Sequence, residues 1–184
     1  MNSTQLALLY NTMVLPHLQY CIINWGNFRN DSNIGLRNKL LTLQKCLVRI
    51  INGAHRISHA DPYFFNGSIL KIDDLYEQSI RMFAFKLHNT CNLLPQEIGS
   101  MFNKIDHPHN TRGAKNNFFV VLSDKRSMKS IAPACWNSLP LQMKQCPSVT
   151  SFKNTSKTDL LAPYAAFSCH NHNCQSCQMN TNPA

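Results

Sequence analysis

Acidic residues are scarce in this sequence of 184 residues, with nine Asp and Glu against eighteen Lys and Arg. The formal net charge at pH 7 is therefore +9. This balance favours a polyanionic partner, most simply a nucleic acid, although a basic protein without such a partner has the same composition. Hydrophobic residues make up 43% of the chain, which argues against disorder throughout.

A long, uninterrupted apolar run is also missing. The nearest approach is LYNTMVLPHLQYCIINWG, residues 9–26, which Asn11, His17 and Asn24 interrupt. This stretch fits neither a membrane-spanning helix of about 20 apolar residues nor a signal peptide, which begins with positive charge. Its apolar side chains recur at mostly helical spacing. We therefore expect an amphipathic helix packed on a partner, and kinked or divided at Pro16.

The common catalytic and nucleotide-binding motifs do not occur. The segment GAHRISH, residues 53–59, has one glycine and no Lys followed by Ser or Thr, so it is no phosphate-binding P-loop. There is no G-x-S-x-G nucleophile elbow. A small enzyme with a Cys–His nucleophile pair stays an alternative, because such a pair leaves no general sequence trace.

One acidic pair, Asp73 and Asp74, invites a catalytic interpretation. Paired carboxylates hold two divalent metal ions in nucleotidyl-transfer enzymes, where they lie at a hairpin. Here the pair leads directly into helical periodicity. We interpret it as the first turn of a helix, where negative charge complements the helix dipole.

The spacing of apolar residues predicts a mainly α-helical fold with a small β element, an α+β class. Helices are expected over residues 31–53, 60–65, 73–89, 96–102 and 148–161, and a strand over residues 118–122. The helix over 31–53 has an apolar stripe at steps of four, three, four and three, made by Leu36, Leu40, Leu43, Leu47 and Ile50. A change in composition near residue 162 separates a polar tail, 162–184, from the rest of the chain.

Cationic residues are the candidate nucleic-acid contacts. Arg and Lys bind phosphates and fix register without reading bases. The alternative is an ordinary solvated helix face. Most of the candidates lie off the apolar stripe of the helix over 31–53 or shortly after it, and two lie in the loop segment HNTRGAK. They are Arg37, Lys39, Lys45, Arg49, Arg56, Arg112 and Lys115.

The tail segment CHNHNCQSC, residues 169–177, is a candidate zinc site. Its C-x-x-C spacing suits zinc, and Cys169 with either His170 or His172 would complete four ligands. The predicted set is Cys169, His172, Cys174 and Cys177. All lie within nine residues and lack apolar neighbours, so a disordered polar tail is the alternative. The eight cysteines, without a signal sequence, indicate a reducing compartment, hence thiols or metal ligands rather than disulfides.

Several short segments occur in an order that resembles a known family. They are LYNTMVLPHLQYCIINWG, LQKCLVRIING, SHADPYFF, ILKIDDLYEQSIRMFAFKLHN followed by LLP, HNTRG, and ACWNSLPLQMKQCPSVTSFKNTSK. The series resembles the region after the catalytic palm in reverse transcriptases of jockey-like non-LTR (LINE) retrotransposons. The resemblance covers about residues 6–161. It implies a thumb-like helical segment over residues 1–57, a mixed helical connector over 58–161, and a chain that is the C-terminal piece of a longer polyprotein.

The resemblance also sets functional expectations. The catalytic aspartates of such polymerases lie upstream, so this chain alone is expected to be inactive and to need no cofactor, apart from the candidate zinc, whereas the full polymerase would use Mg²⁺. The expected partners are the RNA template, the DNA primer, and the missing palm and fingers, with no membrane. The expected location is intracellular, in cytoplasm and nucleus. The alternatives are an independent zinc-binding interaction module and a retroelement relic without function.

Overall fold

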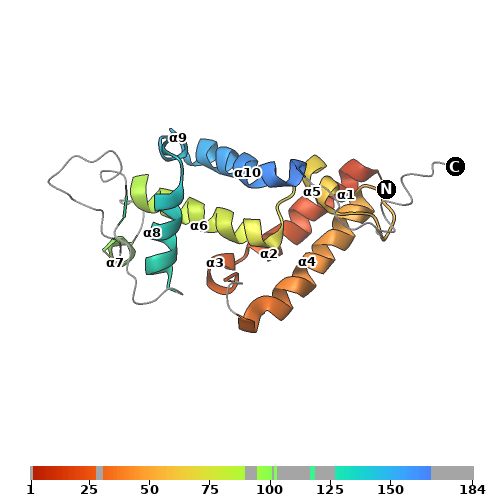
Figure 1. The fold of residues 1–184 in the computed structure, drawn as a ribbon, viewed down its shortest axis with the longest axis horizontal. Coiled ribbons are helices and arrows are strands. Elements are labelled where there is room, and N and C mark those ends of the chain that lie inside the picture. The colour runs from red at the N-terminus through yellow and green to blue at the C-terminus, as the bar shows by residue number, and fades with distance from the viewer. Residues whose placement is uncertain are drawn as a thin grey trace. The chain divides into compact units, whose positions relative to one another are not determined.

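The computed structural model describes residues 2–27, 31–89, 95–100, 102, 117–118 and 127–166. These residues are mainly helical, which confirms the predicted class (Figure 1). Of the expected strand over 118–122, Phe118 makes a β-bridge and the other residues lie outside the described part. In chain order the elements are α1 (Ser3–Leu9), the π-helical turn η1 (Tyr10–Val14), α2 (Leu15–Gln19), α3 (Ile22–Trp25), α4 (Asp31–Ile51), α5 (Asp61–Asn66), α6 (Ile72–Asn89), α7 (Gln96–Gly99), α8 (Met128–Ser138), α9 (Leu141–Lys144) and α10 (Val149–Ala165).

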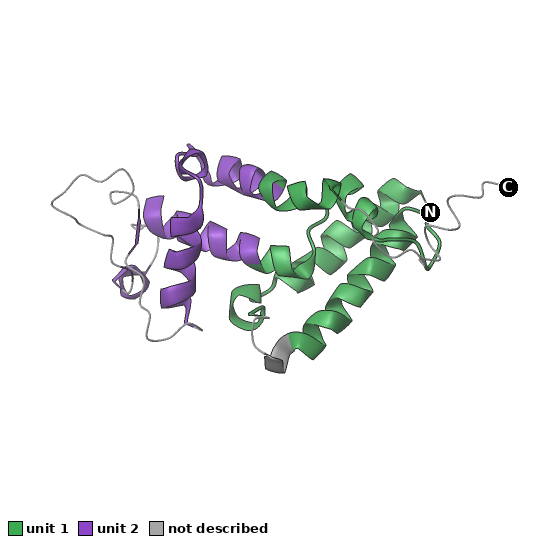
Figure 2. Cartoon of the chain, viewed as in Figure 1, with its two compact units in different colours: residues 1–76, 158–184 green, residues 77–157 purple. Residues whose placement is uncertain are grey.

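The chain forms two compact units (Figure 2). Unit 1 comprises residues 1–76 and 158–184, and unit 2 comprises residues 77–157. Both α6 and α10 therefore contribute residues to each unit. These units are groups of residues in spatial contact, and they are not continuous in the sequence. They are a different kind of division from the predicted one at residues 57/58 and 161/162, which stays a prediction.

The N-terminal stretch is divided next to Pro16, as expected. The chain turns from α1 into η1, where the backbone N–H of Leu15 donates to the carbonyl of Tyr10, five residues back. Pro16 then lies in the first turn of α2, a position at which proline is tolerated. The π-helical turn thus lets the chain stay helical up to the proline. Helix α1 packs against α4, in agreement with the predicted amphipathic packing.

Helix α4 buries a different face from its apolar stripe. Leu36, Leu43 and Ile50 are 47%, 60% and 60% exposed, whereas Gln44 and Val48 are 1% and 0% exposed. Successive residues of an α-helix are about 100° apart around the axis. The buried residues Gln44 and Val48 therefore lie about 100° around the helix from Leu43 and Leu47 of the stripe. Sequence periodicity finds the stripe, but it misses the core face because that face includes a glutamine.

Gln44 is buried because the fold satisfies its amide. The side-chain nitrogen donates to the Tyr10 hydroxyl at 3.1 Å and to the Leu70 carbonyl at 3.2 Å. The side-chain oxygen accepts from the backbone N–H of Ile72 at 2.8 Å. This N–H is one of the unpaired donors at the start of α6. Gln44 thereby joins α4, η1 and the segment leading into α6 through bonds that an apolar residue would not make.

The end of α10 closes the core of unit 1. The Tyr164 hydroxyl donates to the Asp74 carboxylate and accepts from the backbone N–H of Lys71. The Lys71 ammonium pairs with Asp61 and lies 4.4 Å from the centroid of the Tyr164 ring. The ring of Phe64 meets that of Tyr164 edge to face at 6.4 Å. Tyr164 is 8% exposed, so α10 is part of the core three residues beyond the predicted boundary at 161.

Unit 2 has an aromatic core built by α6, α8 and α10. Phe85 stacks on Phe152 with ring centroids 4.3 Å apart and meets Trp136 edge to face at 6.2 Å. The imidazole of His88 stacks on Trp136 at 4.8 Å. Phe118 is held beside them because Asn137 bonds both its N–H and its carbonyl, at 3.0 and 2.9 Å.

Among the helices that the structure describes, none is both long and apolar enough to cross a membrane.

Candidate nucleic-acid interface

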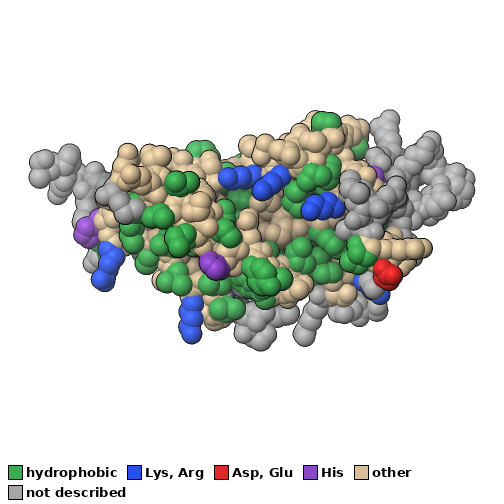
Figure 3. Space-filling view, turned by 180° about the vertical axis from the view of Figure 1, so that it is seen from behind, with side chains coloured by type: hydrophobic (Ala, Val, Ile, Leu, Met, Phe, Trp, Pro, Cys, Tyr) green, Lys and Arg blue, Asp and Glu red, His purple; other side chains and the backbone are tan. Residues whose placement is uncertain are grey.

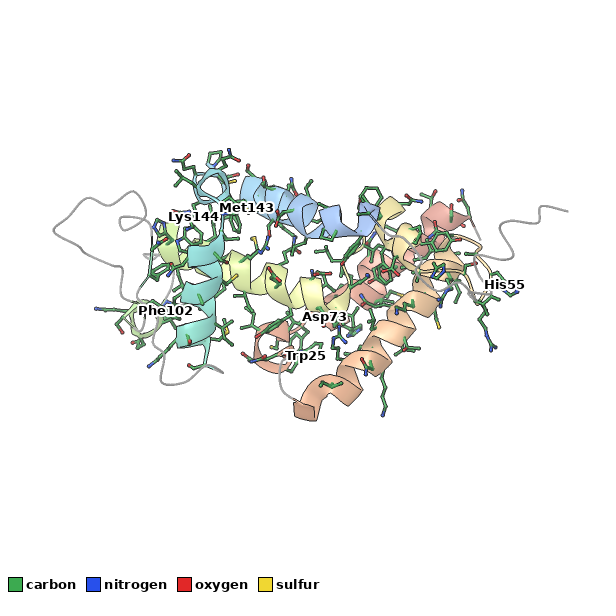
Figure 4. All side chains as sticks on the ribbon, viewed as in Figure 1. Trp25, His55, Asp73, Phe102, Met143 and Lys144 are labelled. Carbon is green, nitrogen blue, oxygen red and sulfur yellow. The ribbon has the colours of Figure 1, made fainter. Side chains whose placement is uncertain are left out.

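The acidic pair at the start of α6 has a structural role. Asp73 and Asp74 both lie in the first turn of α6, as the sequence predicts, and Figure 4 labels Asp73 there. Asp73 accepts two hydrogen bonds from Arg37, from Nε to Oδ1 and from Nη2 to Oδ2, each 2.6 Å long. Asp74 accepts the hydroxyl of Tyr164. Each carboxylate therefore joins α6 to another helix.

Arg37 consequently differs from the other candidate cations. The bidentate hydrogen bonds to Asp73 raise the pKa of the Arg37 guanidinium, and the charge of Asp73 adds to the same effect. A phosphate at this guanidinium would compete with a carboxylate that is already in place. Arg37 remains a candidate contact, but the structure gives it a partner within unit 1 that the sequence did not predict.

Arg49 also makes a hydrogen bond within unit 1. Its Nε donates to the carbonyl of Ser58 at 2.7 Å, which ties the last turn of α4 to the segment before α5. This bond uses one of the five N–H donors of the guanidinium and leaves the charge without an acidic partner among the described residues. Arg49 can therefore serve the fold and still face a phosphate.

Three candidate cations have no partner among the residues that the structure describes. Lys39 and Arg56 are exposed and Lys45 is half-buried. Within the described part of the chain, none of the three makes a side-chain hydrogen bond or an ion pair. Lys45 and Arg49 lie one helical turn apart, so they share a face of α4, while Lys39 lies about 120° away around the helix. Arg56 follows the C-terminal end of α4, next to His55, which Figure 4 labels.

Around α4, three kinds of surface follow one another. The consecutive residues Leu43, Gln44 and Lys45 are exposed apolar, buried polar and half-buried cationic. One turn later, Val48 repeats the buried position and Arg49 the cationic one. The cationic face and the apolar stripe therefore lie on opposite sides of the core face, about 200° apart.

The remaining predicted site residues lie outside the described part of the chain. These are the loop cations Arg112 and Lys115 and the zinc candidates Cys169, His172, Cys174 and Cys177. In the ranges that the structure does describe, no group of three or more His, Cys, Asp or Glu is placed to hold a metal ion.

Unit 2 contains cations that the sequence analysis did not single out. Lys153 is exposed and Lys157 half-buried, one turn apart on α10. Burial lowers the pKa of Lys157, and the charge of Lys153 lowers it further. Burial also lowers the pKa of Lys144, whose Nζ donates to Asn117 and to the carbonyl of Asn137 at 3.1 and 3.2 Å. The spacing of Lys153 and Lys157 by four was visible in the sequence, but the absence of an ion pair to either of them among the described residues was not.

On the face drawn in Figure 3, hydrophobic side chains are widespread, several basic side chains are visible and acidic ones are scarce. This distribution agrees with the excess of Lys and Arg in the composition.

No protein-family model matches the chain, and no curated protein and no solved structure matches it either.

Proposed function

We propose that this chain is a non-catalytic part of an RNA-directed DNA polymerase, similar to the region after the palm in jockey-like non-LTR reverse transcriptases. In this role unit 1 contacts the sugar-phosphate backbone of the RNA template and DNA primer. The chain supplies no catalytic aspartates and works with the palm and fingers of the polymerase, in the cytoplasm and nucleus. The Mg²⁺ of the reaction would bind to the palm.

The observation that carries the proposal is the uncompensated charge of Lys39, Lys45 and Arg56. The neighbouring cations of unit 1 are used internally, Arg37 by Asp73 and Lys71 by Asp61. In contrast, these three have no acidic partner among the described residues. A phosphodiester backbone supplies the missing negative charge, and binding is favoured further by the release of counterions from the nucleic acid.

Binding of the chain to a labelled RNA–DNA hybrid, titrated across salt concentrations, tests the proposal. We expect affinity to fall steeply with salt. Replacing Lys39, Lys45 and Arg56 together by Gln should reduce the slope of log affinity against log salt by about two to three units, because each lost phosphate contact removes about 0.9. Sequence preference should not change, since backbone contacts carry no base information.

A matched variant controls for net charge. Replacing Lys129, Lys153 and Lys157 of unit 2 by Gln removes the same charge from cations that also lack ion pairs in the described part of the chain. If this variant lowers the slope as much, the contacts do not belong to unit 1. If the wild-type chain unfolds cooperatively but does not bind the hybrid, the proposal is wrong.

A further inference from the structure

Exposed apolar side chains are concentrated in unit 1. Of the eleven large hydrophobic residues that are exposed in the described part of the chain, ten belong to this unit and one, Leu141, to unit 2. The ten are Leu8, Leu9, Met13, Tyr20, Ile34, Leu36, Leu43, Ile50, Ile57 and Phe65. Isolated exposed apolar residues are ordinary on proteins, but an accumulation on one unit indicates an interaction surface.

The most regular part of this surface is the apolar stripe of α4. Leu36, Leu43 and Ile50 are 47%, 60% and 60% exposed, and Leu40 and Leu47 between them are half-buried. We call these five residues the α4 seam. Their steps of four, three, four and three are the spacing with which a helix meets a second helix in a coiled coil. The seam runs from residue 36 to residue 50, which is about 21 Å of helix.

Charge around the α4 seam discriminates between possible occupants. Arg37 and Lys39 occupy the two flanks of the seam, at the positions that correspond to e and g of a heptad. Helix α4 contains four cations and one acidic residue, Asp31 at its first position. A second copy of this chain would bring the same cationic helix and a further charge of +9. A helix with acidic flanks is instead attracted by Lys39, whereas Arg37 on the other flank is already paired with Asp73.

We propose that the α4 seam is a docking site for an amphipathic helix of another polypeptide, with an apolar seam of its own and Glu or Asp along its flanks. The docked helix buries Leu36, Leu43 and Ile50, which the fold leaves in water. Its acidic side chains meet Lys39 on one flank, while the other flank holds the half-exposed Arg37–Asp73 pair. The seam is separate from the face of Lys45 and Arg49, and Lys39 is the one proposed phosphate contact on α4 that lies beside the seam.

A pair of synthetic peptides tests the charge and the shape of the docking site. Both have Leu at the a and d positions of a short heptad repeat; one has Glu at e and g, the other Lys. A third peptide has the composition of the first with the heptad spacing scrambled. By fluorescence anisotropy of labelled peptide, we expect the Glu peptide to bind the wild-type chain at least about tenfold more tightly than either control.

A double variant tests the location. Replacing Leu43 and Ile50 by Gln should weaken binding of the Glu peptide by about tenfold or more, because two apolar anchors are lost. Both side chains are 60% exposed, so the fold should persist, and urea unfolding checks this. The control is Leu141→Gln in unit 2, a similar change at a residue that is 51% exposed, which should leave peptide affinity unchanged.

Several outcomes would overturn this assignment. One is equal binding of the Glu and Lys peptides, and another is no binding of either. Sedimentation that shows a dimer of the wild-type chain, lost in the Leu43/Ile50 variant, would identify a second copy as the occupant instead. Loss of RNA–DNA hybrid binding in that variant would assign the seam to nucleic acid. If the Leu43/Ile50 variant binds the RNA–DNA hybrid with an unchanged salt slope, a loss of peptide binding concerns the docking site alone and leaves the proposed function untouched.

Discussion

Gln44 illustrates how a single residue can override a helical pattern. An apolar stripe usually marks the side of a helix that faces the core. In α4, three hydrogen bonds satisfy the buried amide of Gln44. The buried face of the helix includes Gln44 and Val48, while Leu36, Leu43 and Ile50 of the stripe are exposed. The burial of this face depends on the hydrogen-bond partners of Gln44, which are 26 to 34 residues away along the chain. A local sequence pattern therefore does not reveal it.

Tyr164 permits a prediction about pH. Replacing Tyr164 by Phe removes the hydroxyl that bonds Asp74 and the N–H of Lys71, and should cost about 1–3 kcal/mol of unfolding free energy near pH 8. Burial raises the pKa of this phenol, and its bond to Asp74 raises it further. Above pH 10, the ordinary tyrosine pKa, the unfolded chain therefore releases this proton while the folded chain keeps it. Stability from Tyr164 is thus full below pH 10 and declines above it.

Urea unfolding of the wild type and the Tyr164→Phe variant at about pH 8 and about pH 11 measures this effect. The difference in unfolding free energy between the two proteins should shrink at the higher pH, because Phe does not titrate. Tyr20→Phe is the matched control, since Tyr20 is 76% exposed. A difference that stays constant or grows with pH would contradict the buried position of Tyr164.

Helix boundaries are the element-scale features that the sequence predicts best. The predicted starts at residues 31 and 73 and the predicted end at residue 53 all lie within about two residues of the observed bounds. These signals are local, because capping and backbone conformation depend on a few neighbouring residues. Which face of each helix is buried is not a local property, as α4 demonstrates.

The two glycines of the α4 region should respond oppositely to alanine. Gly53 has a φ of +61°, a conformation in which a Cβ is strained, so Gly53→Ala should destabilise the protein by about 1 kcal/mol. Gly35 lies inside α4, and a Cβ there meets no atom within 4 Å. Gly35→Ala should therefore stabilise by about 0.5–1 kcal/mol through helix propensity.

Thermal and urea unfolding of both single variants compare these effects. Because both substitutions add one methyl group, the pair controls for size. Equal effects of the two changes would mean that the left-handed turn after α4 does not determine where the helix ends.

At the scale of the whole molecule, unit 1 depends on chain segments from both ends of the sequence. Residues 158–165 of α10 bring Leu160, Leu161 and Tyr164 into its core, where they are 7%, 8% and 8% exposed. Composition suggested a boundary near residue 162, since few core residues follow it. Helix α10 continues past this position to Ala165, and Tyr164 lies in the core of unit 1.

Truncation tests this dependence. A chain that ends at Lys157 lacks the α10 residues of unit 1, whereas a chain that ends at residue 166 keeps them. We expect hydrogen exchange in α4 and α5 to be much faster in the shorter chain than in the longer one, because three core side chains are missing. Equal protection in the two chains would show that α10 contributes nothing to the stability of unit 1.

The sequence by itself determined the charge, the helical class, most helix ends and the role of Asp73 and Asp74 as a helix start. These features follow from composition, apolar spacing and capping, which act over a few residues. The tertiary structure alone decided that Arg37 is paired with Asp73, that Lys39, Lys45 and Arg56 are not paired within the described residues, and that the α4 seam faces water. Such properties depend on contacts between distant segments, such as Gln44 with Ile72, and periodicity in one segment carries no information about its partners.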